Sequence, residues 1–431
     1  MSKRSKRTPT AAADKNDSFW KRLGPGLVTG AADDDPSGIA TYSQAGASMG
    51  YGLLWTIWLT FPLMVAIQMV CARIGCVTGH GLATNIRKYS SLPLLYAIVA
   101  LLFVANTINI AADIAAMGAA AKLLMGGPAL GYALALGVVS LLLQVFVPFK
   151  HYAPLLKFLT FVLLAYVATV FFVKVPWSQV LHRSLVPGLT WNSAALMMIV
   201  AVFGTTISPY LFFWQASNEV EKVNADDDAT PLKRDGTDAE PQLNRITLDT
   251  VVGMALSNLV AFFIMVTAAA VLHAKGVTDI QTSAQAAEAL RPVAGKFAFA
   301  LFAVGILGTG LLAVPVLAAS SAYAAAETFR WPLGLERRWS KARGFYAVIA
   351  AGMLGGMALD FTPIDPVKAL VWSAVINGVI AVPIMAVVMR IGSMKRAMGA
   401  FVVPWPLRLF GWLATATMTA AVLGLLWSWL H

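Results

Sequence analysis

Long apolar runs follow one another along almost the whole chain, separated by short polar stretches or by glycine and proline. Runs of about 18 to 25 apolar residues have the length of a helix that crosses a lipid bilayer. Eleven such segments are predicted, near residues 26–47, 52–77, 94–121, 129–148, 153–173, 194–217, 246–272, 297–325, 344–359, 366–389 and 407–430. The pattern predicts an all-α integral membrane protein with about eleven transmembrane helices.

The composition supports a bilayer protein. Of the 431 residues, 58% are hydrophobic and only 12% are charged, whereas a soluble domain carries about 25% charged residues. The net charge of +11 is explained by basic cytoplasmic loops, so a nucleic-acid partner is not expected. No phosphate-binding glycine motif occurs, so neither ATP nor a resident cofactor is expected. The oligomeric state stays open.

The basic residues predict an orientation. With the tail 1–22 in the cytoplasm, the inner loops hold roughly 23 Lys and Arg and the outer loops about 7, which is a strong positive-inside bias. We expect a multi-pass protein of a bacterial-type inner (plasma) membrane. Its N-terminus would be cytoplasmic and its C-terminus outside.

Two of the segments contain a proline break near the middle. In the first, Asp33–Asp35 precede Pro36, and each carboxylate would cost about 2.5 to 3.5 kcal/mol in lipid, so they should line a cavity. We expect the helix to unwind from Pro36 to Gly38, which frees carbonyl groups. The sixth segment repeats the break at Gly204–Pro209. Two ordinary proline kinks are the alternative interpretation.

Broken spans at the same position in each half are typical of inverted-repeat transporters. The predicted organisation is a tail (1–22), a first repeat of five helices (23–174), a second repeat (194–389) with a cytoplasmic linker (218–245), and an extra helix (407–431).

The breaks offer oxygen ligands for a metal ion. Asp35 supplies a carboxylate, and the other candidate ligands are hydroxyls or freed carbonyls at Ser37, Gly38, Thr205, Thr206 and Ser208. Such a set suits Mg²⁺, Mn²⁺ or Ca²⁺, and a site with so little charge favours an ion that keeps part of its water shell, as Mg²⁺ does. No methionine, histidine or cysteine stands at either break.

Polar residues in two other spans are further candidates. Asn109 and Asp113 share one helical face of the third span, and Asn377 lies in the tenth. These residues either line an aqueous pathway or hydrogen-bond to a neighbouring helix. Asp34 is a candidate for supporting the ion from behind Asp35.

At these residues the chain resembles the Nramp family of divalent metal transporters, which use the fold of the sodium-coupled amino-acid symporters. The resemblance covers nearly the whole chain and is carried by Gly24–Gly26, Asp35–Ala40, Ala45–Ala47, Tyr51–Gly52 and Gly204–Pro209. It implies two inverted five-helix repeats with broken first and sixth helices and one extra span, and a metal ion as substrate.

The chain departs from the family's motifs. In the first motif, Asp-Pro-Gly-Asn, Asp35 matches the aspartate but Gly38 stands at the asparagine. In the sixth-helix motif, Ala-Thr-Val-Met-Pro-His, Thr205, Ser208 and Tyr210 replace the alanine, methionine and histidine, which makes Tyr210 a further pathway candidate.

The resemblance also bears on proton coupling. The acidic pair linked to coupling in the family's third helix aligns with Ala112 and Ala115. Asp113 is adjacent but is expected to face elsewhere. These departures resemble the Nramp-related magnesium transporters, so we expect import of Mg²⁺ and Mn²⁺ by alternating access with little or no proton coupling.

Three alternatives remain open at this point. They are a proton-coupled Mn²⁺/Fe²⁺ importer, an organic-solute symporter of the same fold, and a metal sensor that acts through the 218–245 stretch.

Overall fold

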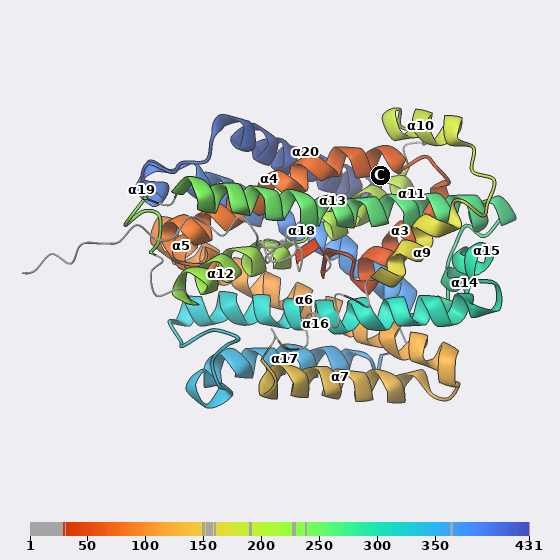
Figure 1. Cartoon of the computed structure of the whole chain (residues 1–431), viewed down its shortest axis with the longest axis horizontal. Helices are drawn as coiled ribbons and strands as arrows, with labels where there is room; N and C mark the ends of the chain where they lie inside the picture. Colours follow the sequence, from red (N-terminus) through yellow and green to blue (C-terminus); the bar gives the residue numbers. More distant parts are fainter. Residues whose placement is uncertain are drawn as a thin grey trace, which may run out of the picture.

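The computed structural model describes residues 29–30, 32–148, 151, 158, 161–188, 192–225, 230–237, 239–362 and 365–430. Helices joined by turns and irregular segments make up this part of the chain, with no strand among the described residues. Long helices lie side by side along the long axis of the molecule (Figure 1). Figure 1 places α5 and α19 at one end of the bundle and α10, α14 and α15 at the other.

The helices have the following bounds: α3 Pro36–Met49, α4 Leu54–Thr78, α5 Leu82–Tyr89, α6 Leu92–Met125, α7 Ala129–Phe146, α9 Leu164–Thr169, α10 Trp177–Leu185, α11 Ser193–Thr206, α12 Pro209–Ala225, α13 Ala239–Val271, α14 Ser283–Ala287, α15 Arg291–Ala294, α16 Ala298–Phe329, α17 Arg343–Leu359, α18 Pro366–Gly392, α19 Lys395–Met398 and α20 Trp405–Leu430. Short 3₁₀ turns lie at Phe161–Leu163, His273–Lys275, Glu288–Leu290, Gly295–Phe297 and Trp339–Lys341.

In the described part of the chain, eight helical stretches are long and apolar enough to cross a membrane, and α17 is a shorter apolar helix. The first and fifth expected spans, 26–47 and 153–173, lie partly outside the described residues. The all-α, multi-span fold class is confirmed.

The first helix is broken, but two residues earlier than the sequence suggested. The chain bends at Asp34, Asp35 is the N-cap, and α3 starts at Pro36 with Gly38 inside the helix. The predicted unwinding from Pro36 to Gly38 is therefore wrong. A proline at the first helical position costs nothing, because the N–H it lacks has no partner there. The Asp35 carboxylate instead accepts the Gly38 N–H at 2.7 Å.

The sixth helix is broken in the same way. α11 ends at Thr206, Ile207 and Ser208 are non-helical, and α12 begins at Pro209. Proline again occupies the first helical position after the break. The pair of breaks leaves α3 and α11 in contact with each other and α18 in contact with both.

A glycine lets α11 and α18 approach closely beside the second break. A Cβ atom on Gly204 would lie 2.0 Å from the Ala374 carbonyl oxygen and 2.5 Å from the Gly378 nitrogen. Small residues allow such backbone contacts between membrane helices. The contact fixes the position of Thr205 and Ser208 relative to α18.

The polar stretch 218–245 is largely helical where it is described. α12 continues to Ala225 and α13 begins at Ala239, whereas residues 226–229 and 238 lie outside the described residues. Within the stretch, Arg245 on α13 forms an ion pair with the fully buried Glu219 on α12 at 2.5 Å. These two helices are thereby joined at the end that carries α5.

Candidate metal-transport site

Asp35 lies where the two broken helices meet and is buried, with 2% of its surface exposed. Its Oδ1 accepts the Gly38 N–H, and its Oδ2 accepts a hydrogen bond from the Asn109 side chain at 3.1 Å. The Tyr210 hydroxyl, on α12, lies 3.5 Å from Oδ2 and donates to the Ala32 carbonyl at 2.9 Å. Groups from α3, α6 and α12 therefore converge on one carboxylate.

A chain of polar side chains leads from Asp35 into the third span. The Asn109 amide also lies 3.5 Å from Asp113 Oδ2, and the Asn377 amide lies 3.5 Å from Asn109 Oδ1. Asp113 is fully buried, and its Oδ1 has no hydrogen-bond partner in the described structure. The expectation that Asp113 faces elsewhere is wrong, because residues 109 and 113 are one helical turn apart on the side of α6 that faces α3.

Three oxygens surround the position where a side chain would start on Gly38. An added Cβ would lie 3.2 Å from the Asp33 carbonyl oxygen, 3.3 Å from Thr205 Oγ1 and 3.5 Å from Asp35 Oδ1. The absence of a side chain at Gly38 thus leaves carbonyl, hydroxyl and carboxylate oxygens close together across the two breaks. Among the three atoms nearest to this position, Thr205 Oγ1 is the one that comes from the second broken helix.

The hydroxyls of Ser208 and Thr206 donate to backbone carbonyl groups of α11. Ser208 donates to the carbonyls of Gly204 and Thr205 at 2.9 and 2.7 Å, which are groups freed at the end of α11. Thr206 donates to Val202 at 2.7 Å, away from Asp35. Ser208 therefore keeps lone pairs for a cation at the break, whereas the Thr206 hydroxyl accepts a hydrogen bond from Tyr42 on α3 at 2.9 Å.

Ser37 also points away from the carboxylate. Its hydroxyl lies 3.2 Å from the Leu370 carbonyl and 3.3 Å from the Ser373 hydroxyl, both on α18. The Ser37 hydroxyl therefore does not join the Asp35 cluster. It ties the start of α3 to α18.

Sequence reasoning missed the residue that holds the two neighbouring aspartates. The Ser257 hydroxyl, on α13, lies 2.6 Å from Asp33 Oδ2 and 3.2 Å from Asp34 Oδ1. Asp34 is thus directed to α13 and not to Asp35. A serine inside a long apolar span carries no signal of this role, because the contact joins residues more than 200 positions apart.

The donors around Asp35 are oxygen and amide groups only. In the ranges that the structure describes, no three His, Cys, Asp or Glu side chains are grouped to hold a metal. A cation at this site would meet one carboxylate, neutral oxygens and its own water. Hard cations accept such ligands, and Mg²⁺ keeps much of its hydration shell in proteins.

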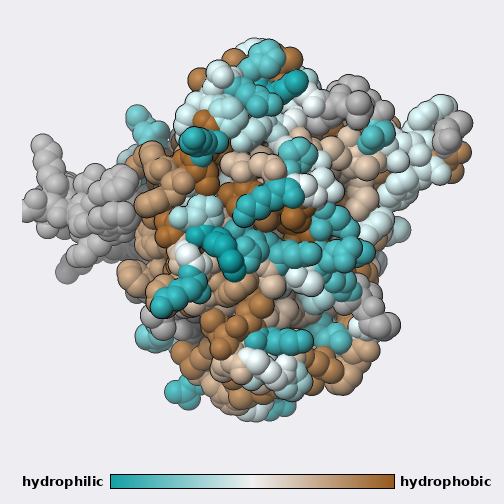
Figure 2. All heavy atoms as spheres, turned by 90° about the vertical axis from the view of Figure 1, so that its right-hand side faces the viewer, coloured by the Kyte–Doolittle hydropathy of each residue, from teal (hydrophilic) through white to brown (hydrophobic). Residues whose placement is uncertain are grey.

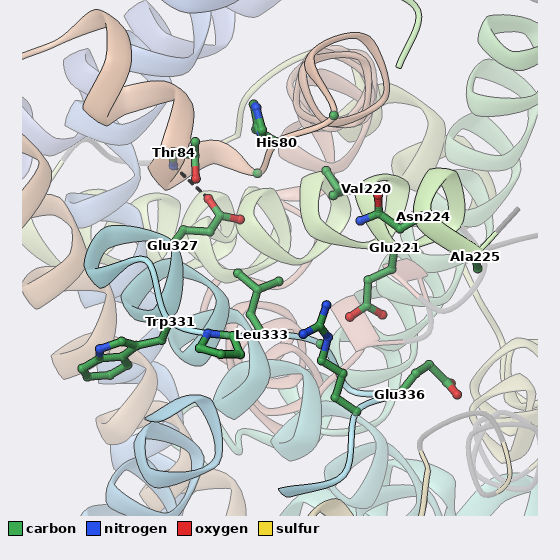
Figure 3. Close-up of a pocket in the computed structure, with 15 residues that line it drawn as sticks. His80, Thr84, Val220, Glu221, Asn224, Ala225, Glu327, Trp331, Leu333 and Glu336 are labelled. Atoms are coloured by element: carbon green, nitrogen blue, oxygen red, sulfur yellow. Dashed lines mark hydrogen bonds between the residues drawn. The ribbon is translucent and has the colours of Figure 1, made fainter. Parts of the chain in front are cut away.

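A separate cavity of about 580 Å³ lies at the end of the bundle that carries α5. Figure 3 shows His80, Glu221 and Glu327 on its walls, with the Thr84 N–H donating to Glu327 at 2.9 Å. None of the residues around Asp35 lines it. Its acidic side chains make it attractive to cations at that mouth of the protein.

Two helices broken at matching positions around the buried Asp35 carboxylate define a membrane transporter of the inverted-repeat class. Comparison with known proteins agrees. The chain belongs to the Nramp family, since the family model described as natural resistance-associated macrophage protein-like matches residues 26–428.

Two curated relatives carry the name divalent metal cation transporter MntH. The protein from Klebsiella pneumoniae (strain 342) is 27% identical over 407 residues, which is 92% of each chain. The protein from Aeromonas hydrophila subsp. hydrophila is 30% identical over 344 residues, which is 77% of this chain and 79% of that one. Both are described as transporters and not as enzymes.

Solved structures share the fold. The crystal structure of the Eremococcus coleocola manganese transporter with an aromatic bis-isothiourea substituted compound has a TM-score of 0.73 at 19% identity, covering 96% of this chain and 88% of that one. The nucleobase-cation-symport-1 family transporter Mhp1, closed with bromovinylhydantoin bound, has a TM-score of 0.53 at 14% identity, covering 94% and 92%. The two inverted five-helix repeats with broken helices 1 and 6 are thus the fold of this chain.

Proposed function

We propose that this protein carries divalent metal cations across the membrane and that Mg²⁺ and Mn²⁺ are the ions it imports. The carrying observation is the buried carboxylate of Asp35 at the first break, whose described hydrogen-bond partners are a backbone N–H, an amide and a hydroxyl, all of them neutral. Relatives named as divalent metal cation transporters support the general class. The metal ion is substrate in this proposal, and no cofactor is needed.

The choice of hard ions rests on what stands at the second break. Ser208 offers only a hydroxyl, and its neighbours Gly204 and Thr205 offer carbonyl oxygens. The described hydrogen-bond partners of the Asp35 carboxylate are Gly38, Asn109 and Tyr210, and none of them is a soft thioether or imidazole ligand of the kind that favours later transition metals. A hydrated Mg²⁺ or an Mn²⁺ ion fits such a set, with Asp35, Thr205 and Ser208 as the nearest contacts and Gly38 as the gap that makes room.

Transport would follow alternating access, with the broken helices rocking against the remaining scaffold. We place the repeats at 23–174 and 194–389 and the extra helix at 407–431. The basic helices α5 and α19 gather at one end in Figure 1, which supports a cytoplasmic location for that end. From the excess of basic residues in the expected inner loops, we place the N-terminus in the cytoplasm and the C-terminus outside. The membrane we propose is a bacterial-type inner (plasma) membrane. Two charges that cross 100 mV gain roughly 4.6 kcal/mol, enough to drive entry without another ion.

A proton-coupled Mn²⁺/Fe²⁺ importer is the second candidate, and one observation favours it. Asp113 is a second buried carboxylate that reaches Asp35 through the amide of Asn109. A proton held by such a group could move with the metal. An organic-solute symporter has less support, because an organic anion at the half-helix ends would meet Asp33–Asp35.

Uptake into liposomes tests the proposal. Purified protein would be reconstituted and given Mg²⁺ or Mn²⁺ under a negative internal potential, with and without a pH gradient, while lumenal pH is recorded. We expect both ions to enter without acidification, Asp35→Ala to abolish uptake, and Asp360→Ala, a carboxylate change beyond the end of α17, to leave it intact. Uptake of neither ion by the intact protein would overturn the proposal.

Two variants separate the candidates. Ser208→Met should shift preference from Mg²⁺ toward Mn²⁺, whereas Ser208→Ala, which removes the hydroxyl without adding sulfur, should not. If only Mn²⁺ enters, protons accompany it, and Asp113→Asn removes the proton flux, then the proton-coupled candidate is correct.

A further inference from the structure

A second cavity, of about 360 Å³, lies at the opposite end of the bundle from α5, between α10 and the ends of α3 and α13. Its walls include Lys174, Arg183 and His273, together with the polar Gln179. No acidic side chain is among these lining residues in the described part of the chain. Neither Lys174 nor Arg183 forms an ion pair with any described residue.

The walls of this cavity are held in place by backbone contacts. Gly188 donates to the Gly52 carbonyl at 3.4 Å, which ties the segment after α10 to the turn before α4. The Arg183 guanidinium packs on Gly188, where an added Cβ would lie 2.2 Å from one of its nitrogens. The His273 ring is fixed as well, because its Nδ1 lies 2.7 Å from the Ala47 carbonyl, which accepts the hydrogen bond. These contacts position Arg183 and His273 in the wall of the cavity.

The cavity does not belong to the cation route. Two positive charges with no acidic side chain among the described lining residues repel a divalent cation and attract an anion. The cavity of Figure 3 differs in the charge of its walls, which carry the acidic residues Glu221 and Glu327. An anion is the ligand class that this end of the molecule favours.

Helix α10 indicates where that anion comes from. Pro176, Gln179 and Arg183 face the cavity, whereas Trp177, Leu181 and Leu185 form an exposed apolar edge, with Leu185 82% exposed. An amphipathic helix with such an edge lies in the membrane interface with its apolar side among the acyl chains. Figure 2 looks onto this end of the molecule, and hydrophilic residues lie beside apolar ones near its top, where Figure 1 places α10. A cavity beside a helix in that position would open at the depth of lipid headgroups.

We propose that this cavity binds the phosphodiester headgroup of an anionic phospholipid, with Lys174 and Arg183 pairing with the phosphate and the acyl chains lying along the apolar edge of α10. A free phosphate has the same anionic group but no acyl chains that could contact the apolar edge of α10. On the orientation proposed above, the lipid belongs to the outer leaflet. The binding itself does not depend on transport, so its test is separate from that of the proposed function.

Native mass spectrometry of the purified full chain, titrated with phosphatidylglycerol and with phosphatidylcholine, tests this proposal. Phosphatidylglycerol should bind more tightly, and the double variant K174Q/R183Q should lose about 25-fold in affinity, at roughly fivefold for each basic side chain near a membrane surface. The matched control is K122Q/K296Q, which removes the same charge from exposed positions that do not line the cavity. The control should bind as the wild type does.

Three results would overturn the proposal. Equal losses in both double variants would show attraction by net charge alone. Equal binding of the two lipids would show that the site does not select lipids by the net charge of the headgroup. Displacement of phosphatidylglycerol by millimolar inorganic phosphate would identify a free-anion site instead. Unchanged melting temperatures and Mn²⁺ uptake in K174Q/R183Q would establish that the variant is folded.

Discussion

Gly204→Ala is the substitution whose consequence the structure specifies most closely. Gly204 lies on α11 one residue before Thr205, and its Cα faces the backbone of α18. Adding one methyl group there changes no charge and no hydrogen-bonding group. Any effect must therefore come from pushing α11 and α18 apart beside the second break.

The size of the effect follows from the contact distances. The new Cβ would lie 2.0 Å from the Ala374 carbonyl oxygen and 2.8 Å from the Gly378 Cα, and an ordinary contact begins near 3.4 Å. The two helices would have to separate by more than an ångström, because both contacted atoms are backbone and cannot rotate away. Overpacking typically costs 1–3 kcal/mol, and we expect about 3 kcal/mol here.

The assay is thermal unfolding of the detergent-purified protein together with Mn²⁺ uptake. Gly204→Ala should lower the melting temperature and also reduce uptake, since Thr205 and Ser208 move away from Asp35. Gly424→Ala is the control: it lies on α20, and its Cβ would meet only Leu196 side-chain atoms at 3.6 and 4.0 Å. If Gly204→Ala melted and transported like Gly424→Ala, the close contact of α11 and α18 would not exist in the protein.

Three further predictions rest on single contacts. Asn109→Ala should raise the KM for Mn²⁺ about tenfold at little change in maximal rate, because Asn109 orients the Asp35 carboxylate; an unchanged KM in the uptake assay would contradict this. Glu219→Gln should destabilise the protein by about 1–2 kcal/mol, since Arg245 loses its buried partner but reaches water, and unchanged thermal unfolding would refute it. Burial raises the pKa of Asp360 to about 7 from 3.8 in the unfolded chain. The folded state therefore loses stability as the pH rises from about 4 to 7, because the buried carboxyl group must then ionise. The melting temperature of Asp360→Asn should be higher than that of the wild type at pH 8 but not at pH 4.

Much of the architecture is predictable from the sequence, because its signals are local. A continuous apolar run predicts a membrane helix, and a proline next to polar residues predicts a break in it. Asp35 is identifiable for the same reason, since a carboxylate in an apolar span must face a cavity. The position of the first break was missed by two residues because Pro36 starts a helix as readily as it ends one.

The residues from other helices that contact the site cannot be predicted from the local sequence. Ser257 holds Asp33, Asn109 donates to Asp35, and Ser37 turns to α18. Each of these contacts joins residues far apart in the chain. A helical face is readable from spacing, but the helix that it faces is not. An alignment of motifs placed Asp113 away from the site, whereas the packing of α6 against α3 brings it in.

The sequence by itself determined that this chain is a bundle of membrane helices with two proline breaks and one exceptional carboxylate, because lipid forces every backbone group to be satisfied within its own helix and penalises every buried charge. Only the tertiary structure decided which oxygens and amides surround that carboxylate, and that Gly38 and Gly204 leave the room for them to converge. Those contacts depend on helix rotation and on approaches of a few ångströms between backbones, which no apolar pattern encodes.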